Sequence, residues 1–166
     1  MTTQVSAALA RFRSAALRYC EFVDSLATHS VETFLGGAET PLLELYASAL
    51  ELPAVAPDSA EVDNLPRPIE KEVALFKSLR EKLGSSEIYY TIFNSINPEK
   101  PMQGSLANDF SEIYFDLKHD LELTASDAPS NDVLWTLRFS FRSHWGRHAI
   151  SALKALHDLR SLNIDC

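Results

Sequence analysis

The sequence lacks the features that would place it in a membrane or outside the cell. It has two cysteines, Cys20 and Cys166, at opposite ends of 166 residues, which argues against a disulfide framework. No apolar run is long enough to span a bilayer. The first twenty residues lack the basic, apolar and small-residue order of a secretory signal. We therefore expect a cytoplasmic protein with no membrane segment.

Positive charge is also scarce. Fifteen Lys and Arg stand against 23 Asp and Glu, a net charge of -8, which argues against nucleic-acid binding. The imbalance is local: residues 99–127 hold seven acids and two lysines, whereas residues 131–166 hold five basic residues and three acids. This complementarity predicts that the two segments pack on each other. The partner is then an unknown protein or a small ligand.

The chain is rich in apolar residues, and they recur at the spacing of helices. Hydrophobic residues make up 46% of it, nine of them Phe, and they recur at spacings of three and four. We predict a single domain, residues 1–166, that is all-α. Its architecture is an antiparallel bundle of about five or six helices, with an irregular Pro-rich loop at 53–67 between the second and third.

Local signals predict where several helices begin and end. Gly36-Gly37 should end one helix and Thr40-Pro41 should cap the next. A further helix should begin at Pro68 and close at Gly84. The segment 86–96 has aromatic and β-branched residues typical of a strand, but no second strand is evident to pair with it, so we interpret it as a short helix.

The last two helices should begin at serine caps, Ser105 and Ser130, and the second of them should run unbroken to about Leu159. A glycine inside that helix, Gly146, costs about 1 kcal/mol relative to alanine, and close approach of another helix would explain it.

Polar residues occupy core-facing positions of this final helix. At about 100° per residue, His148 falls inside the apolar stripe one turn beyond Trp145. Arg138 lies at one edge of the stripe and His144 at the other. On the preceding helix an acid row flanks the core, formed by Asp109, Asp116 and Asp120 with Glu112 further out. Unpaired buried charge is expensive, so we predict that these acids meet the histidines or Arg138.

Three segments carry a resemblance to a known family: "LLELYASALELP", "SLANDFSEIYFDLKHDL" and "LWTLRFSFRSHWGRHAISALKALHDL". They resemble an uncharacterised bacterial family, a domain of unknown function of the DUF5063 type. The shared positions are Asp109, Glu112 (Asp in the family pattern), Tyr114, Asp116, Lys118, Trp145, Gly146 and His148. The resemblance implies that His148 and the acids belong together, and it implies no activity.

Two functions from different classes remain open. The first is a helical interaction or small-ligand-binding module whose polar cluster comprises Asp109, Glu112, Asp116, Arg138, His144, Trp145 and His148. The alternative is a metal-dependent hydrolase of the all-α nucleotide pyrophosphohydrolase kind, with Mg²⁺ held by Glu70, Glu72, Glu112 and Asp116. The usual pair of Glu-x-x-Glu motifs is absent, so we favour the first and expect no cofactor or tightly bound metal, although His144 and His148 have zinc-ligand spacing.

Overall fold

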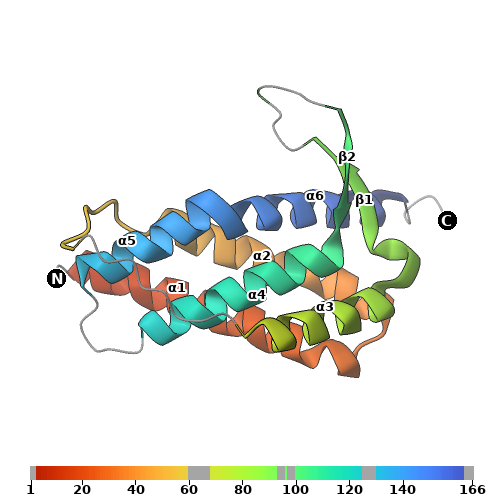
Figure 1. Ribbon diagram of the computed structural model, residues 1–166, viewed down its shortest axis with the longest axis horizontal. Coiled ribbons are helices and arrows are strands. Elements are labelled where there is room, and N and C mark those ends of the chain that lie inside the picture. The colour runs from red at the N-terminus through yellow and green to blue at the C-terminus, as the bar shows by residue number, and fades with distance from the viewer. Residues whose placement is uncertain (1–2, 60–67, 93–95, 97–99, 125–129, 163–166) are drawn as a thin grey trace.

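The computed structural model describes residues 3–59, 68–92, 96, 100–124 and 130–162, and it is an all-α helical bundle (Figure 1). Most helices run along one long axis, and a small β-hairpin projects from the bundle beside the last helix. The helices are α1 (Thr3–Asp24), α2 (Val31–Leu50), α3 (Ile69–Leu83), α4 (Leu106–Leu123), α5 (Asn131–Ser140) and α6 (Gly146–Leu162). The hairpin consists of β1 (Ile88–Thr91) and β2 (Met102–Ser105).

The core lies where the apolar stripes of the helices meet. Phe12 and Tyr19 on α1, Phe34 on α2 and Phe110 on α4 have no exposed surface. Tyr19 is satisfied in the core because its hydroxyl donates to the carbonyl oxygen of Phe110 at 3.1 Å. The acidic helix α4 and the final helix α6 pack directly on each other, as the charge complementarity predicts.

The predicted break in the second helix is wrong. α2 begins after Ser30, whose hydroxyl caps the backbone N–H of Thr33, and runs through both glycines and Pro41 to Leu50. At Gly37 a side chain would begin 3.3 Å from the ring of Phe22, so the glycine makes room for a helix neighbour. Burial of the apolar stripe of α2 stabilises the helix by more than the hydrogen bond lost at Pro41 costs, so tertiary packing overrides the local signal.

The interpretation of segment 86–96 as a helix is also wrong over its strand portion. Ile88–Thr91 forms β1, paired antiparallel with Met102–Ser105, and Tyr89 lies opposite Gly104. The partner strand reads Met-Gln-Gly-Ser and has no apolar alternation, so periodicity could not reveal it. Residues 93–95 lie outside the described part of the chain.

The Pro-rich loop lies between α2 and α3 as predicted, and its described part, residues 53–59, is irregular. Two backbone N–H groups of the loop, at Asp58 and Ser59, donate to Asp132 Oδ1 at 2.7 and 2.9 Å. These bonds hold the loop against the start of α5. Residues 60–67 are outside the described part. The predicted caps Ser105 and Ser130 are confirmed.

The predicted unbroken final helix is instead interrupted by one wide turn. Phe141–Trp145 forms a π turn between α5 and α6, in which the N–H of Gly146 donates to the carbonyl of Phe141. π turns inside helices frequently mark functional sites. The glycine is required by this turn rather than by a neighbouring helix, because a Cβ on Gly146 would collide with the Phe141 carbonyl and lie 2.8 Å from its ring.

We expect Gly146→Ala to destabilise the protein by about 1–3 kcal/mol, because the added methyl group overpacks the π turn. Gly36→Ala is the matched control, since nothing lies within 4 Å of a Cβ at that position of α2. There alanine should be neutral or stabilise by up to about 1 kcal/mol through helix propensity. Urea denaturation of both variants measures the difference, and equal changes would show that the turn has room for a side chain.

Across the described residues, no helix combines the length and the apolar character needed to cross a membrane.

Candidate functional site

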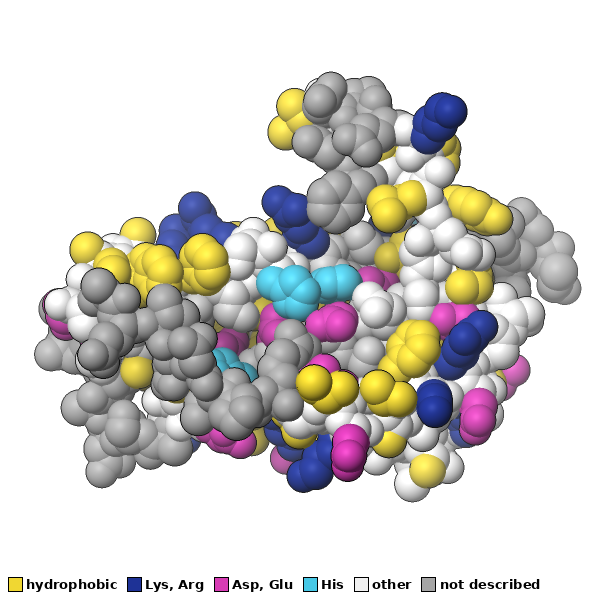
Figure 2. Space-filling view, viewed as in Figure 1, with side chains coloured by type: hydrophobic (Ala, Val, Ile, Leu, Met, Phe, Trp, Pro, Cys, Tyr) yellow, Lys and Arg dark blue, Asp and Glu magenta, His cyan; other side chains and the backbone are white. Residues whose placement is uncertain are grey.

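A cleft of about 510 Å³ lies between the hairpin, α4 and α6. The side chains of His144 and His148 on α6, Asp109 on α4 and Tyr89 on β1 line it. Figure 2 shows two histidine side chains next to each other on this face, bordered by acidic residues. The cleft therefore joins two elements the sequence predicted, α4 and α6, to a hairpin it did not.

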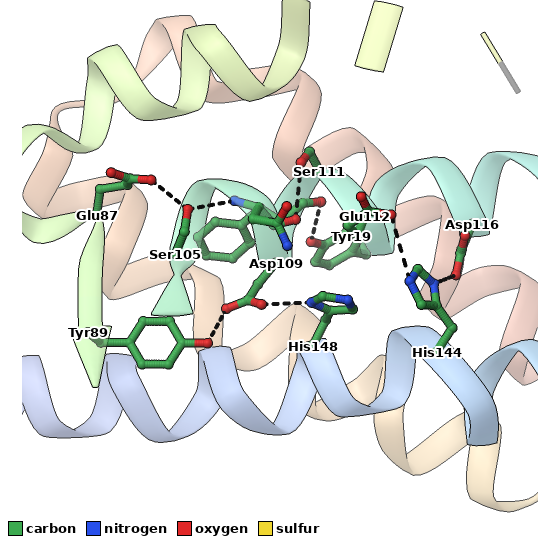
Figure 3. A network of polar contacts seen from close by, with 12 residues as sticks. Tyr19, Glu87, Tyr89, Ser105, Asp109, Ser111, Glu112, Asp116, His144 and His148 are labelled. Atoms are coloured by element: carbon green, nitrogen blue, oxygen red, sulfur yellow. Dashed lines mark hydrogen bonds and ion pairs between the residues drawn. The ribbon is translucent and has the colours of Figure 1, made fainter. Parts of the chain in front are cut away.

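One buried carboxylate organises the inner wall of the cleft (Figure 3). Asp109 Oδ2 accepts the hydroxyl of Tyr89 at 2.6 Å, and Oδ1 lies 2.8 Å from His148 Nδ1. A carboxylate only accepts hydrogen bonds, so Nδ1 of His148 is the donor in this contact and Nε2 is turned away from Asp109. Burial, followed by the charge of Asp109 and its hydrogen bond, raises the pKa of Tyr89, which stays a donor.

A second histidine–carboxylate pair lies one turn away. His144 Nδ1 is 2.6 Å from Asp116 Oδ2, and its Nε2 is 3.9 Å from Glu112 Oε2. The two imidazole rings meet edge to face with centroids 5.0 Å apart. Both rings are thus oriented by carboxylates from α4, an arrangement that fixes the ring nitrogens that a ligand would contact (Figure 3).

The hairpin is fixed to the start of α4 by a chain of hydrogen bonds. Ser105 Oγ donates to Glu87 Oε1 at 2.5 Å and accepts the backbone N–H of Asn108 at 3.1 Å, so the capping residue also holds β1. Glu87 Oε2 lies 3.7 Å from Arg80 Nε on α3. This network positions the hairpin, and with it Tyr89, over the cleft.

A glycine in β2 sets the place of the Tyr89 ring. Gly104 lies directly opposite Tyr89 in the hairpin, and a Cβ there would overlap the tyrosine ring. The ring crosses the strand at this point, and its hydroxyl reaches Asp109. Glycine is therefore the residue that lets Tyr89 join the site.

The structure brings five of the seven predicted cluster residues together: Asp109, Glu112, Asp116, His144 and His148. Arg138 is not among them, because its Nη1 donates to the carbonyl of Leu52 at 2.6 Å. Trp145 is fully buried in the core, where its ring packs on Phe12 and Phe141. The π turn changes the helix phase between α5 and α6, so one regular helix could not predict the surroundings of Arg138.

Sequence reasoning missed Tyr89, Gly104, Glu87 and Arg147 as residues of this cleft. Glu87 and Tyr89 lie in segment 86–96, which the sequence pattern led us to interpret as a helix, and Gly104 lies on the partner strand, where no element was predicted. The alternation from Ile88 to Thr91 was the available signal, but it lacked a recognisable partner strand.

Asp120, the last member of the acid row, has a different environment from the others. It has no exposed surface, and neither carboxylate oxygen has a hydrogen-bond partner among the described residues. The nearby indole N–H of Trp145 favours the charged form slightly without reaching hydrogen-bond geometry. Burial, followed by the charge of Asp116, raises the pKa of Asp120 well above its ordinary value. The row thus contains carboxyl groups that are paired with histidines and one buried carboxyl group, Asp120, whose pKa is raised.

The hydrolase alternative gains no support. Glu112 and Asp116 both face His144, so this pair already has a partner. In the described part of the chain no three His, Cys, Asp or Glu side chains converge as a metal site would require.

Comparisons with known proteins indicate a family but no activity. A family model described as "Domain of unknown function (DUF5063)" matches residues 3–161. The crystal structure of protein BF1032 from Bacteroides fragilis is similar in fold, with a TM-score of 0.75 and 22% identity. The similarity covers 92% of this chain and 91% of that one. No match is found among curated proteins.

Proposed function

The chain belongs to the DUF5063 family, a domain of unknown function, and we propose that it binds a small molecule in the cleft between the hairpin, α4 and α6. The observation that carries this proposal is the Tyr89–Asp109–His148 contact at the cleft wall. The Asp109 carboxylate is only 5% exposed and already accepts from two side chains, so a ligand in the cleft has little access to it. It acts on the ligand indirectly, by orienting the imidazole.

The charge distribution favours an anionic ligand. The cleft acids Glu87 and Asp109 have side chains only 6% and 5% exposed, and both already accept hydrogen bonds. The exposed ionisable side chains of the lining, Arg80 and Arg147, are basic, and the two histidines beside them are half-buried. Guanidinium groups bind carboxylate and phosphate well. Because Nδ1 of His148 contacts Asp109, its Nε2 is the nitrogen left for a ligand, so the ligand should combine an anionic group with a polar group such as a hydroxyl.

Further proposals follow from the sequence. We propose that the 166 residues are one domain and that the protein is cytoplasmic. The low cysteine count supports the second proposal, since 166 residues include two cysteines and Cys20 is a free, buried thiol.

We expect glycerol phosphate to bind more tightly than inorganic phosphate, and both to bind more tightly than glycerol or ethanolamine. NMR titration of ¹⁵N-labelled protein measures this, through the amide signals of Tyr89, Asn108 and Ser151 in the cleft lining. His148→Ala should weaken the binding of glycerol phosphate at least about tenfold. His157 is an exposed histidine of the same helix, and His157→Ala should leave the affinity unchanged. Tighter binding of ethanolamine, or no change in these amides with any anion, would contradict the proposal.

A further inference from the structure

A second groove, of about 520 Å³, lies where the end of α2, the π turn and α6 meet the hairpin. Its floor is apolar: Tyr46 and Phe141 pack edge to face with ring centroids 5.0 Å apart. Its rim exposes three large apolar side chains, Leu50 at 58%, Ile92 at 42% and Ile150 at 50%. Leu43, one heptad before Leu50 on α2, is also exposed and extends the apolar surface along that helix.

The groove is basic in an acidic chain. Arg142, Arg147 and Lys154 line it, and its described lining includes no acidic residue. Lys154 pairs with Asp158 at 2.6 Å, but both side chains are more than half exposed, so this pair stabilises little and exchanges readily. The net charge of the protein is -8, so the three basic side chains give this groove a charge opposite in sign to that of the whole protein.

The side chains that α6 contributes to the groove lie along one face of that helix. The residues that α6 contributes recur at helical spacing, with Ile150 between Arg147 and Lys154, so they form one stripe. From Arg142 to Lys154 this stripe is roughly 18 Å long at 1.5 Å per residue, about three helical turns.

We propose that this groove binds an acidic amphipathic helix of a partner protein. The apolar face of the partner helix would cover Leu50 and Ile150, and the carboxylates of that helix would pair with the three basic side chains of the groove. Apolar anchors flanked by complementary charge are the usual recognition mode of a helix in a groove. Thr91, Arg147 and Ser151 line both the cleft and the groove. The inference rests on the residues that line only the groove, Arg142, Ile150 and Lys154.

The probe is a fluorescein-labelled helical peptide of about three to four turns, with Leu at the i, i+3, i+4 and i+7 positions and Glu elsewhere. Fluorescence anisotropy should show binding that weakens as salt rises. A peptide with Lys in place of Glu should bind at least about tenfold more weakly. Ile150→Glu and Arg142→Glu should each weaken the acidic peptide at least about tenfold, whereas Leu17→Glu, an exposed leucine on α1, should have no effect.

The protein is tested as the full chain, and circular dichroism with thermal melting establishes that the variants fold, as the exposure of Ile150 leads us to expect. Absence of acidic-peptide binding, equal binding of the Lys peptide, or equal loss in Leu17→Glu would overturn the proposal. So would binding of the protein to phosphatidylglycerol vesicles, or concentration-dependent dimerisation in sedimentation, if Ile150→Glu abolished it, because the groove would then serve a membrane or a second copy.

Discussion

Asp109→Ala is expected to destabilise the protein by about 3 kcal/mol or more, because it removes a buried acceptor from two donors. Asp109 is 4% exposed, and its carboxylate accepts from the Tyr89 hydroxyl and from His148 Nδ1. Without it, a partly buried hydroxyl and a partly buried imidazole lose their partner together. Asp109→Asn keeps the shape of the side chain and one acceptor oxygen, so it should lower the free energy of unfolding by less than Asp109→Ala does.

Urea denaturation at neutral pH measures these changes, with Glu122→Ala as the control. Glu122 is an exposed acid of the same helix, and its substitution should alter the free energy of unfolding by less than about 1 kcal/mol. A double-mutant cycle of Asp109→Ala with Tyr89→Phe isolates the hydroxyl–carboxylate contact. Equal small losses at Asp109 and Glu122 would show that Asp109 is ordinarily solvated, and would remove the basis for the proposed ligand site.

Asp120→Asn is expected to stabilise the protein at neutral and alkaline pH and to change the pH dependence of its stability. Burial and the charge of Asp116 raise the folded-state pKa of Asp120 above the ordinary value of 3.8 that applies to the unfolded chain. Between these two values the folded state holds a proton that the unfolded state has released. The contribution of Asp120 is therefore most favourable below the unfolded pKa and is lost as pH rises, by about 1.4 kcal/mol per pH unit.

Asparagine does not titrate, so the variant should lose this slope. The measurement is the free energy of unfolding of both proteins from about pH 5 to about pH 8, with the exposed Glu122→Gln as control. The gain of Asp120→Asn over the wild-type protein should increase with pH, whereas Glu122→Gln should run parallel to the wild type. Parallel curves for both variants would mean that the Asp120 carboxylate finds water or a donor in the folded protein.

Asp109 and Asp120 show what the acid row could and could not predict. Their helical spacing placed both beside the core, and both are buried. Periodicity gives the face of a helix on which a side chain lies, but not which atoms of other elements meet it. Asp109 found a histidine and a tyrosine, whereas Asp120 lies beside an indole that does not reach it in hydrogen-bond geometry. Asp109 is therefore paired with two donors, whereas burial without a partner raises the pKa of Asp120.

The sequence by itself determined the helical class of this protein, the Ser105 and Ser130 caps and the meeting of α4 with α6. These features depend on the spacing of apolar residues, on capping side chains and on charge, all of which can be read from residues close together in the sequence. Tertiary structure alone decided the rest. The hairpin forms with a second strand that has no alternation of apolar residues. α2 continues through Pro41 because burial of its apolar face stabilises it by more than the proline costs. The π turn separated Arg138 from the cluster. The hairpin and the course of α2 depend on contacts between residues far apart in the chain, and the π turn is a change of helix geometry that the spacing of apolar residues does not show.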